Sequence, residues 1–148
     1  MKVMVSDKAL VKHIKKLQAM KPGQWGLTGD WHVRKKAAYK LGELGDVRAI
    51  EHLVEHACNA NVLALDAIVR IGLLSADNLE IARNALHKLR TSGAALKAQM
   101  GHYRTTIRGN RPIPNEAVWL NTINSASQSL TQGRPLFTKQ TAKKIIKE

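Results

Sequence analysis

Residues 30–46 read DWHVRKKAAYKLGELGD, and this stretch decides the fold. At 100° per residue its apolar side chains share one arc of about 80°: Val33, Ala37, Leu41 and Leu44. Gly45 is a typical residue just past a helix end, and Asp30 and Asp46 are typical N-cap residues. The stretch therefore predicts an amphipathic helix from Asp30 to Leu44, followed by a second helix capped by Asp46.

Residues typical of helix ends, such as N-cap residues, glycine and proline, recur along the chain on both sides of this stretch. Sustained alternation of apolar and polar residues, which indicates strands, is missing from the sequence. Caps and breakers predict helices over 7–20, 30–44, 46–59, 61–72, 75–90 and 94–108, and further ones over 115–130 and 138–147. Residues 111–114 predict an extended connector and 132–135 a turn. Residues 138–147 are either a short basic helix or a tail that orders only on binding. The expected fold class is all-α.

An offset of 30 residues aligns equivalent positions: Ala37 with Ala67, Leu41 with Ile71, Gly42 with Gly72 and Leu44 with Leu74. With its initial Asp, Val33-Arg34, Leu41-Gly42 and Gly45-Asp46, the stretch resembles the second helix of a HEAT-like repeat. Residues 49–54 look like the first helix of the next repeat. The resemblance is to the HEAT-like helical repeat family that includes phycobilin lyases. It implies a short right-handed α-solenoid of three to four helical hairpins over residues 1–110, followed by a C-terminal helical extension, 111–148, with a basic tail.

Few sequence signals point to catalysis. One cysteine, Cys58, excludes a disulfide framework and a Cys-based zinc finger. No phosphate-binding loop, dinucleotide fingerprint or nucleophile elbow is present. His52 and His56 match the H-x-x-E-H zinc pattern, but both histidines are expected on the solvent side of their helix. HEAT-like repeats also occur in one class of alkylpurine DNA glycosylases, yet the resemblance extends to the repeat and not to an active site. We expect a protein that is not an enzyme and has no metal, cofactor or small-molecule substrate.

Two absences bear on location. No stretch approaches the 18 apolar residues that a membrane-spanning helix needs, and residues 1–7 contain no apolar signal region. We expect a cytoplasmic protein without a membrane span.

Charge is the strongest functional signal. The 148 residues carry a formal net charge of +13, and the pI is about 10.3. From Ile81 to Lys147 the only acidic residue is Glu116. Solvated helix faces usually mix both signs, so this depletion favours a polyanion-binding surface. In a solenoid the second helix of each hairpin lines the concave side, which gives a candidate groove: Lys35, Lys36, Lys40, Lys97, Arg104 and Arg108, continued by Arg111.

The last segment and three aromatic residues complete the candidate site. Lys139, Lys143 and Lys144 lie on the basic side of the segment. The segment could dock on the solenoid end as a cap, reach toward nucleic acid or lie on an anionic membrane. Trp25, Trp31 and Tyr39 are candidate aromatic anchors for a partner, although a tryptophan there could equally fill the gap between hairpins.

Two functions follow from this surface. The first is nucleic-acid binding, to DNA or RNA, through phosphate contacts and without sequence specificity. The alternative is a protein-interaction adaptor or inhibitor that docks on an acidic protein surface. Such a protein would be an accessory subunit of a nucleoprotein complex, including one encoded by a mobile element.

Overall fold

A computed structural model describes residues 7–17, 28–57, 62–91 and 116–147, without the side chains of 28–32, 56–57 and 116–119. Every regular element in these ranges is helical: α1 (Asp7–Leu17), α2 (Thr28–Leu44), the 3₁₀ turn η1 (Val47–Ala49), α3 (Ile50–Ala57), α4 (Val62–Gly72), α5 (Ala76–Thr91), α7 (Glu116–Gln132) and α8 (Lys139–Lys147). The expected all-α fold class is confirmed over this part of the chain.

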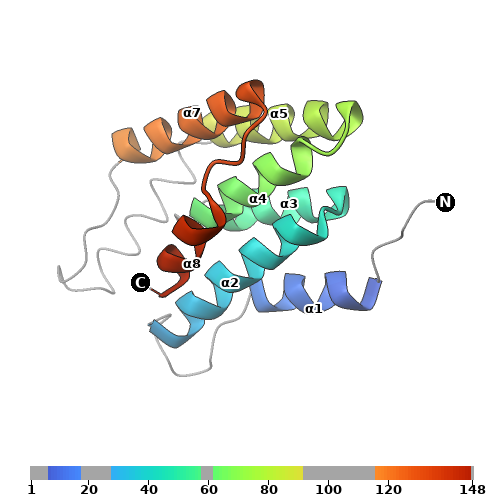
Figure 1. The fold of residues 1–148 in the computed structure, drawn as a ribbon, viewed down its shortest axis with the longest axis vertical. Helices are drawn as coiled ribbons and strands as arrows, with labels where there is room; N and C mark the ends of the chain where they lie inside the picture. Colours follow the sequence, from blue (N-terminus) through green and yellow to red (C-terminus); the bar gives the residue numbers. More distant parts are fainter. Residues whose placement is uncertain (1–6, 18–27, 58–61, 92–115, 148) are drawn as a thin grey trace.

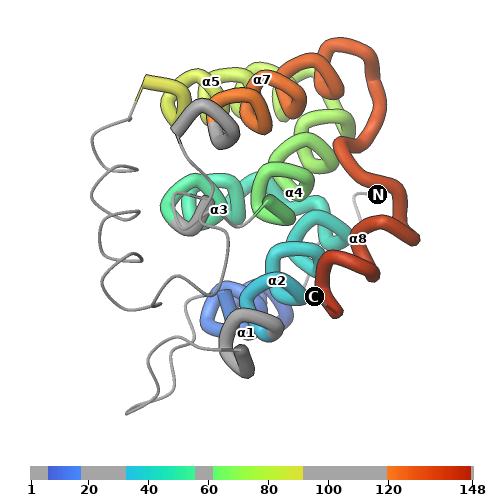
Figure 2. Tube along the Cα trace, turned by 90° about the vertical axis from the view of Figure 1, so that its left-hand side faces the viewer, coloured from blue at the N-terminus to red at the C-terminus, as the bar shows by residue number. Residues whose placement is uncertain are grey.

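The described helices pack as pairs placed one above another (Figures 1 and 2). Helix α1 packs on α2, α3 on α4, and α5 on α7. Helix α4 also contacts α2, α5 and α7, and α3 also contacts α5. Helix α4 is therefore the central element, and each residue from Leu63 to Val69 is buried, as expected for a helix that is covered on all sides.

Two glycines let the central helix approach its neighbours closely. A Cβ atom on Gly42 of α2 would lie 3.0 Å from the Cα atom of Ala67 in α4. A Cβ atom on Gly72, the residue 30 positions later, would lie 2.6 Å from the Cβ of Ala82 in α5 and 2.8 Å from Leu130 Cδ1 in α7. The repeated glycine therefore stands at a close helix contact in both of its occurrences.

Local turn chemistry sets most helix ends where the sequence predicts them. Helix α2 ends at Leu44, and Gly45 follows with a φ of 70° and donates its N–H to Leu41 O at 3.2 Å. The Asp46 carboxylate accepts from the Arg48 backbone N–H at 2.9 Å. Ser75, where the predicted helix 75–90 begins, caps α5, because its hydroxyl accepts from Asn78 N at 3.1 Å.

Two predicted boundaries are wrong. Helix α2 begins at Thr28, so Asp30 lies inside its first turn instead of capping it. Asp46 caps the short turn η1, and α3 begins only at Ile50. The first predicted helix is described over Asp7–Leu17. Residues 18–20, Asn59, Asn61, the connector 111–114 and the predicted helix 94–108 lie outside the described residues, so these predictions are not tested.

The C-terminal segment is a helix that packs against the rest of the protein. Helix α8 contacts α2, and in both views it flanks α2 (Figures 1 and 2). Its Ala142 is fully buried, and Ile145 and Ile146 are partly buried against the core. Of the alternatives that the sequence left open, the packed helix is therefore the observed one, and its apolar side is occupied by the protein itself.

Candidate functional site

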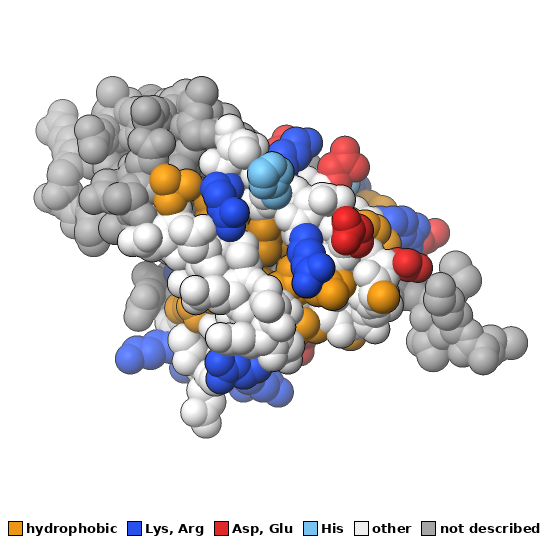
Figure 3. Space-filling model, turned by 90° about the horizontal axis from the view of Figure 1, so that it is seen from above, with side chains coloured by type: hydrophobic (Ala, Val, Ile, Leu, Met, Phe, Trp, Pro, Cys, Tyr) orange, Lys and Arg blue, Asp and Glu red, His pale blue; other side chains and the backbone are white. Residues whose placement is uncertain are grey.

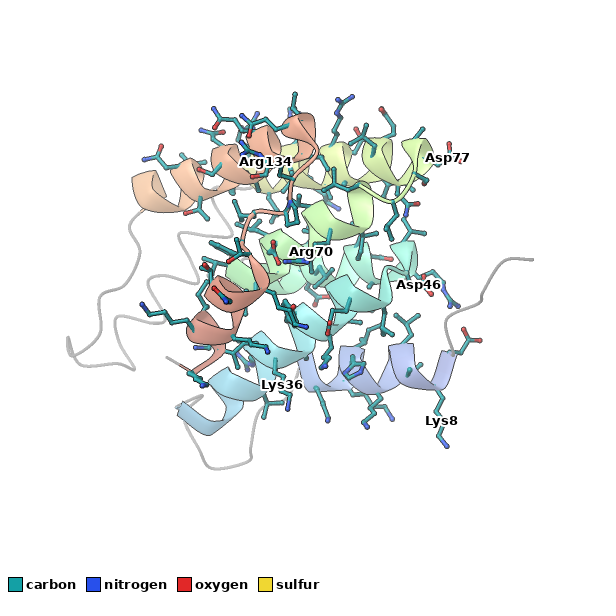
Figure 4. The ribbon with its side chains drawn as sticks, in the orientation of Figure 1. Lys8, Lys36, Asp46, Arg70, Asp77 and Arg134 are labelled. Atoms are coloured by element: carbon teal, nitrogen blue, oxygen red, sulfur yellow. The ribbon has the colours of Figure 1, made fainter. Side chains whose placement is uncertain are left out.

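The four predicted site residues of α2 have different surroundings. Lys35 is only 4% exposed and Tyr39 only 6%. The expectation that both face solvent is wrong, because α1, α4 and α8 all pack on α2 and cover more than one side of it. Lys36 and Lys40 are exposed, and Lys40 forms an ion pair with Glu43 at 3.3 Å. Figure 4 labels Lys36 on α2.

Lys35 holds the last turn of α8. Its Nζ donates to the carbonyl oxygen of Ile145 at 2.6 Å. Carbonyl groups in the last turn of a helix lack a partner within the helix, and a cation is favoured there by the helix dipole. Lys35 therefore has a structural role as a C-terminal cap for α8, and it is not part of an open binding groove.

A second anchor holds the chain where it enters α8. The fully buried Asp66 carboxylate accepts from Phe137 N at 3.0 Å and from Arg70 Nε at 2.7 Å. The Arg70 Nη2 atom in turn donates to Phe137 O at 2.7 Å. The Arg70 guanidinium also lies 5.5 Å from the ring centroid of Tyr39, within cation–π range. This cluster, labelled at Arg70 in Figure 4, fixes the main chain just before α8.

Helix α8 presents the remaining predicted lysines to solvent. Lys139, Lys143 and Lys144 are exposed, as is Lys147; we call these four residues the α8 lysine face. At 100° per residue Lys139, Lys143 and Lys147 form one stripe beside the buried Ala142. Within the described ranges none of the four forms an ion pair with a carboxylate. The face is therefore a fixed row of positive charge that no carboxylate of the described ranges neutralises.

The rest of the predicted site lies outside what the structure describes. Lys97, Arg104, Arg108, Arg111 and Trp25 belong to the ranges 92–115 and 18–27. Trp31 belongs to α2, but its side chain is not described. Lys35 is excluded from the predicted groove between 30–44 and 94–108, and the contribution of 94–108 to it stays a prediction.

Basic side chains that the sequence analysis did not single out line a groove between α5 and α7. Arg83, His87 and Arg90 are exposed and come from α5, and Ser127 and Thr131 come from α7. The groove has a volume of about 150 Å³. Arg90 Nη2 donates to Ser127 Oγ at 3.1 Å. The spacing of 4 and then 3 residues places the three α5 side chains on one helix face. This spacing is visible in the sequence and could have identified the basic face before the structure was known.

Acidic side chains gather away from these basic surfaces. Figure 3 views the molecule from above and shows Lys and Arg side chains spread over this face. The Asp and Glu side chains lie mostly toward the side where α5 begins, and Asp77 marks that end in Figure 4. Among the described residues, the C-terminal half of α5 and helix α8 therefore each present exposed basic side chains away from most of the acidic ones.

The zinc-like pattern finds no support among the described residues. His52 is partly buried, its Nδ1 is without a hydrogen-bond partner, and the His56 side chain is not described. No group of three His, Cys, Asp or Glu side chains suited to a metal ion occurs in the described ranges. In the same ranges, no helix combines the length and hydropathy needed to cross a membrane.

Comparison with known proteins finds no matching family model, no matching curated protein and no matching solved structure.

Proposed function

We propose that this protein binds nucleic acid through phosphate contacts made by the α8 lysine face, without reading the base sequence. The observation that carries the proposal is the fixed α8 lysine face: four exposed lysines that form no ion pair with a carboxylate in the described ranges. Lysine ammonium groups contact phosphate oxygens as point charges, and such contacts give affinity and orientation but no sequence readout.

The anchoring of α8 supports this function. Lys35 at one end and the Asp66–Arg70 pair at the other fix α8 on the core. A fixed row of charge loses less conformational entropy on binding than a free tail does. The apolar side of α8 packs against α2, so it is not available to insert into a membrane. The exposed lysines can still bind a polyanion in water.

The architecture proposed for this surface is a HEAT-like solenoid of stacked helical hairpins. The pairing of α1 with α2, α3 with α4 and α5 with α7 supports it, as does the repeated glycine at the close helix contacts. In this arrangement α8 lies on the layer of second helices. The phosphate-binding surface then runs over α8 instead of through the bare concave side.

Charge reversal tests the proposal. Lys139→Glu, Lys143→Glu and Lys144→Glu are combined in one variant, and Lys8→Glu, Lys12→Glu and Lys15→Glu on α1 in a control with the same change in net charge. Affinity for labelled single-stranded and duplex oligonucleotides is measured by fluorescence anisotropy, after circular dichroism confirms that both variants are folded. The α8 variant is expected to lose at least about tenfold in affinity, and the α1 variant to lose much less.

Two results would contradict the proposal. Equal losses in both variants would show that only the overall charge attracts the nucleic acid. No binding by the unaltered protein at moderate salt would exclude nucleic acid as the partner and leave an acidic protein surface as the candidate.

A further inference from the structure

The groove between α5 and α7 contains a second concentration of positive charge, separate from the α8 lysine face. Arg83 and Arg90 are two helical turns apart on α5, and His87 lies between them on the same face. Their long side chains can therefore converge on one anion above His87. Leu86 and Leu130 also line the groove, and both side chains are buried.

The polar groups in the groove are arranged as donors. Arg90 donates to Ser127 Oγ at 3.1 Å, and the Thr131 hydroxyl donates to Ser127 O at 3.1 Å. The hydroxyl hydrogen of Ser127 has no acceptor in the described part of the chain, so it is available to a ligand. Arg83 likewise forms no ion pair with a carboxylate in that part. The groove thus offers two guanidinium groups and a hydroxyl donor, and the described residues that line it include no carboxylate.

The geometry points to a binding site for one phosphate group in this groove, and we propose that its ligand is a phosphate monoester or inorganic phosphate. Two guanidinium groups match a group with nearly two negative charges and three free oxygens, whereas one guanidinium already satisfies a carboxylate. A volume of about 150 Å³ is below the 300–1,000 Å³ usual for a whole organic ligand. The phosphate enters the groove, and the rest of the ligand stays outside.

Two sources can supply this group: the 5′-terminal phosphate of a nucleic acid, or a free phosphate or nucleotide. The site goes beyond the function proposed for α8, because it recognises the end of a molecule or a small anion and not a backbone. It also does not depend on that function, since inorganic phosphate alone occupies it.

The first test is a titration of the full chain with inorganic phosphate, followed by the amide NMR signals of α5 and α7. Saturable shifts at His87 and Ser127 are expected. Arg83→Gln and Arg90→Gln should each weaken phosphate binding by at least about tenfold, because each removes a charge-assisted hydrogen bond. Lys88→Gln is the matched control: it removes one charge from the same helix, but Lys88 does not line the groove.

The second test separates the two sources. A 5′-phosphorylated and a 5′-hydroxyl oligonucleotide of the same sequence are compared with the unaltered protein and with Arg83→Gln. Tighter binding of the phosphorylated strand, lost in Arg83→Gln, identifies a nucleic-acid end as the source. Equal binding of both strands, together with saturable phosphate shifts, supports the site with a free phosphate or nucleotide as its ligand. The site is overturned if inorganic phosphate causes no saturable shifts, or if the two arginine variants behave like Lys88→Gln.

Discussion

Helices α2 and α8 are both rich in lysine and pack against each other, yet their lysines have different roles. On α2, Lys35 is buried and its Nζ binds the Ile145 carbonyl oxygen, and Lys40 is paired with Glu43. On α8, all four lysines are exposed and form no ion pair within the described ranges. The comparison shows that a run of basic residues in the sequence does not by itself predict an exposed surface, because neighbouring helices cover Lys35 and Glu43 pairs with Lys40. The binding role of α8 remains a proposal.

The largest expected effect comes from removing the anchor that positions α8. Asp66→Ala leaves the Arg70 guanidinium and the Phe137 N–H without their buried acceptor. Breaking one partner of a buried pair is expected to lower the free energy of unfolding by about 3 kcal/mol. Urea denaturation measures the loss, and Asp77→Ala, an exposed acid, is the control, with a change of at most about 0.5 kcal/mol. Similar losses in both variants would show that the anchor contributes little.

Exchanging single lysines for methionine sharpens the comparison between the two helices. Lys35→Met removes the hydrogen bond to Ile145 O and is expected to lower the free energy of unfolding by about 1 kcal/mol, while nucleic-acid affinity stays unchanged. Lys143→Met on α8 should leave stability within about 0.5 kcal/mol but weaken binding equally for all sequences. Urea denaturation and anisotropy titrations measure the two properties. The reverse pattern would assign the binding role to α2.

The smallest expected effect is a pH dependence of stability caused by His13 of α1, the helix that also packs on α2. Burial of His13 on α1, together with the nearby charges of Lys16, Lys12 and Lys40, lowers the pKa of its imidazole below the ordinary value of 6.5. The unfolded chain therefore takes up a proton at a higher pH than the folded chain does. The stability linked to His13 is complete above pH 6.5 and is lost as the pH falls through that value toward the folded pKa.

Denaturation curves at several pH values check this dependence. The free energy of unfolding of His13→Gln should depend less on pH than that of the unaltered protein. The two pH profiles should differ in slope only at acidic pH. Parallel profiles for the two proteins would show that His13 titrates alike in the folded and unfolded states.

Much of the helix pattern could be predicted because it depends on local chemistry. Gly45, Asp46 and Ser75 act within one turn of the chain, and their roles in ending, turning and starting helices are readable from neighbouring residues. The apolar spacing over 115–130 predicts a helix despite many Asn, Ser and Thr residues of weak helix propensity, and the structure has α7 there, over Glu116–Gln132. The docking of α8 was only one alternative, since it depends on contacts with residues about 70 to 110 positions away.

The candidate site was harder to predict for a geometric reason. A helical projection identifies one apolar arc, but α2 is covered by α1, α4 and α8, so Lys35 and Tyr39 are buried outside that arc. The Asp66–Arg70 pair did leave a signal. A carboxylate within the apolar stretch 62–72 must have a buried partner, and an arginine stands four residues later.

The most direct test of the α8 assignment is the salt dependence of nucleic-acid affinity. Affinities over a range of salt concentrations are compared for the unaltered protein, for Lys139→Gln/Lys143→Gln/Lys144→Gln on α8, and for Lys8→Gln/Lys12→Gln/Lys15→Gln on α1. Each phosphate contact contributes about 0.7–0.9 to the log–log slope, so the α8 variant should be shallower by about 2–3, while the α1 variant keeps the slope of the unaltered protein. Equal slopes for the two variants would contradict the assignment of the phosphate contacts to α8.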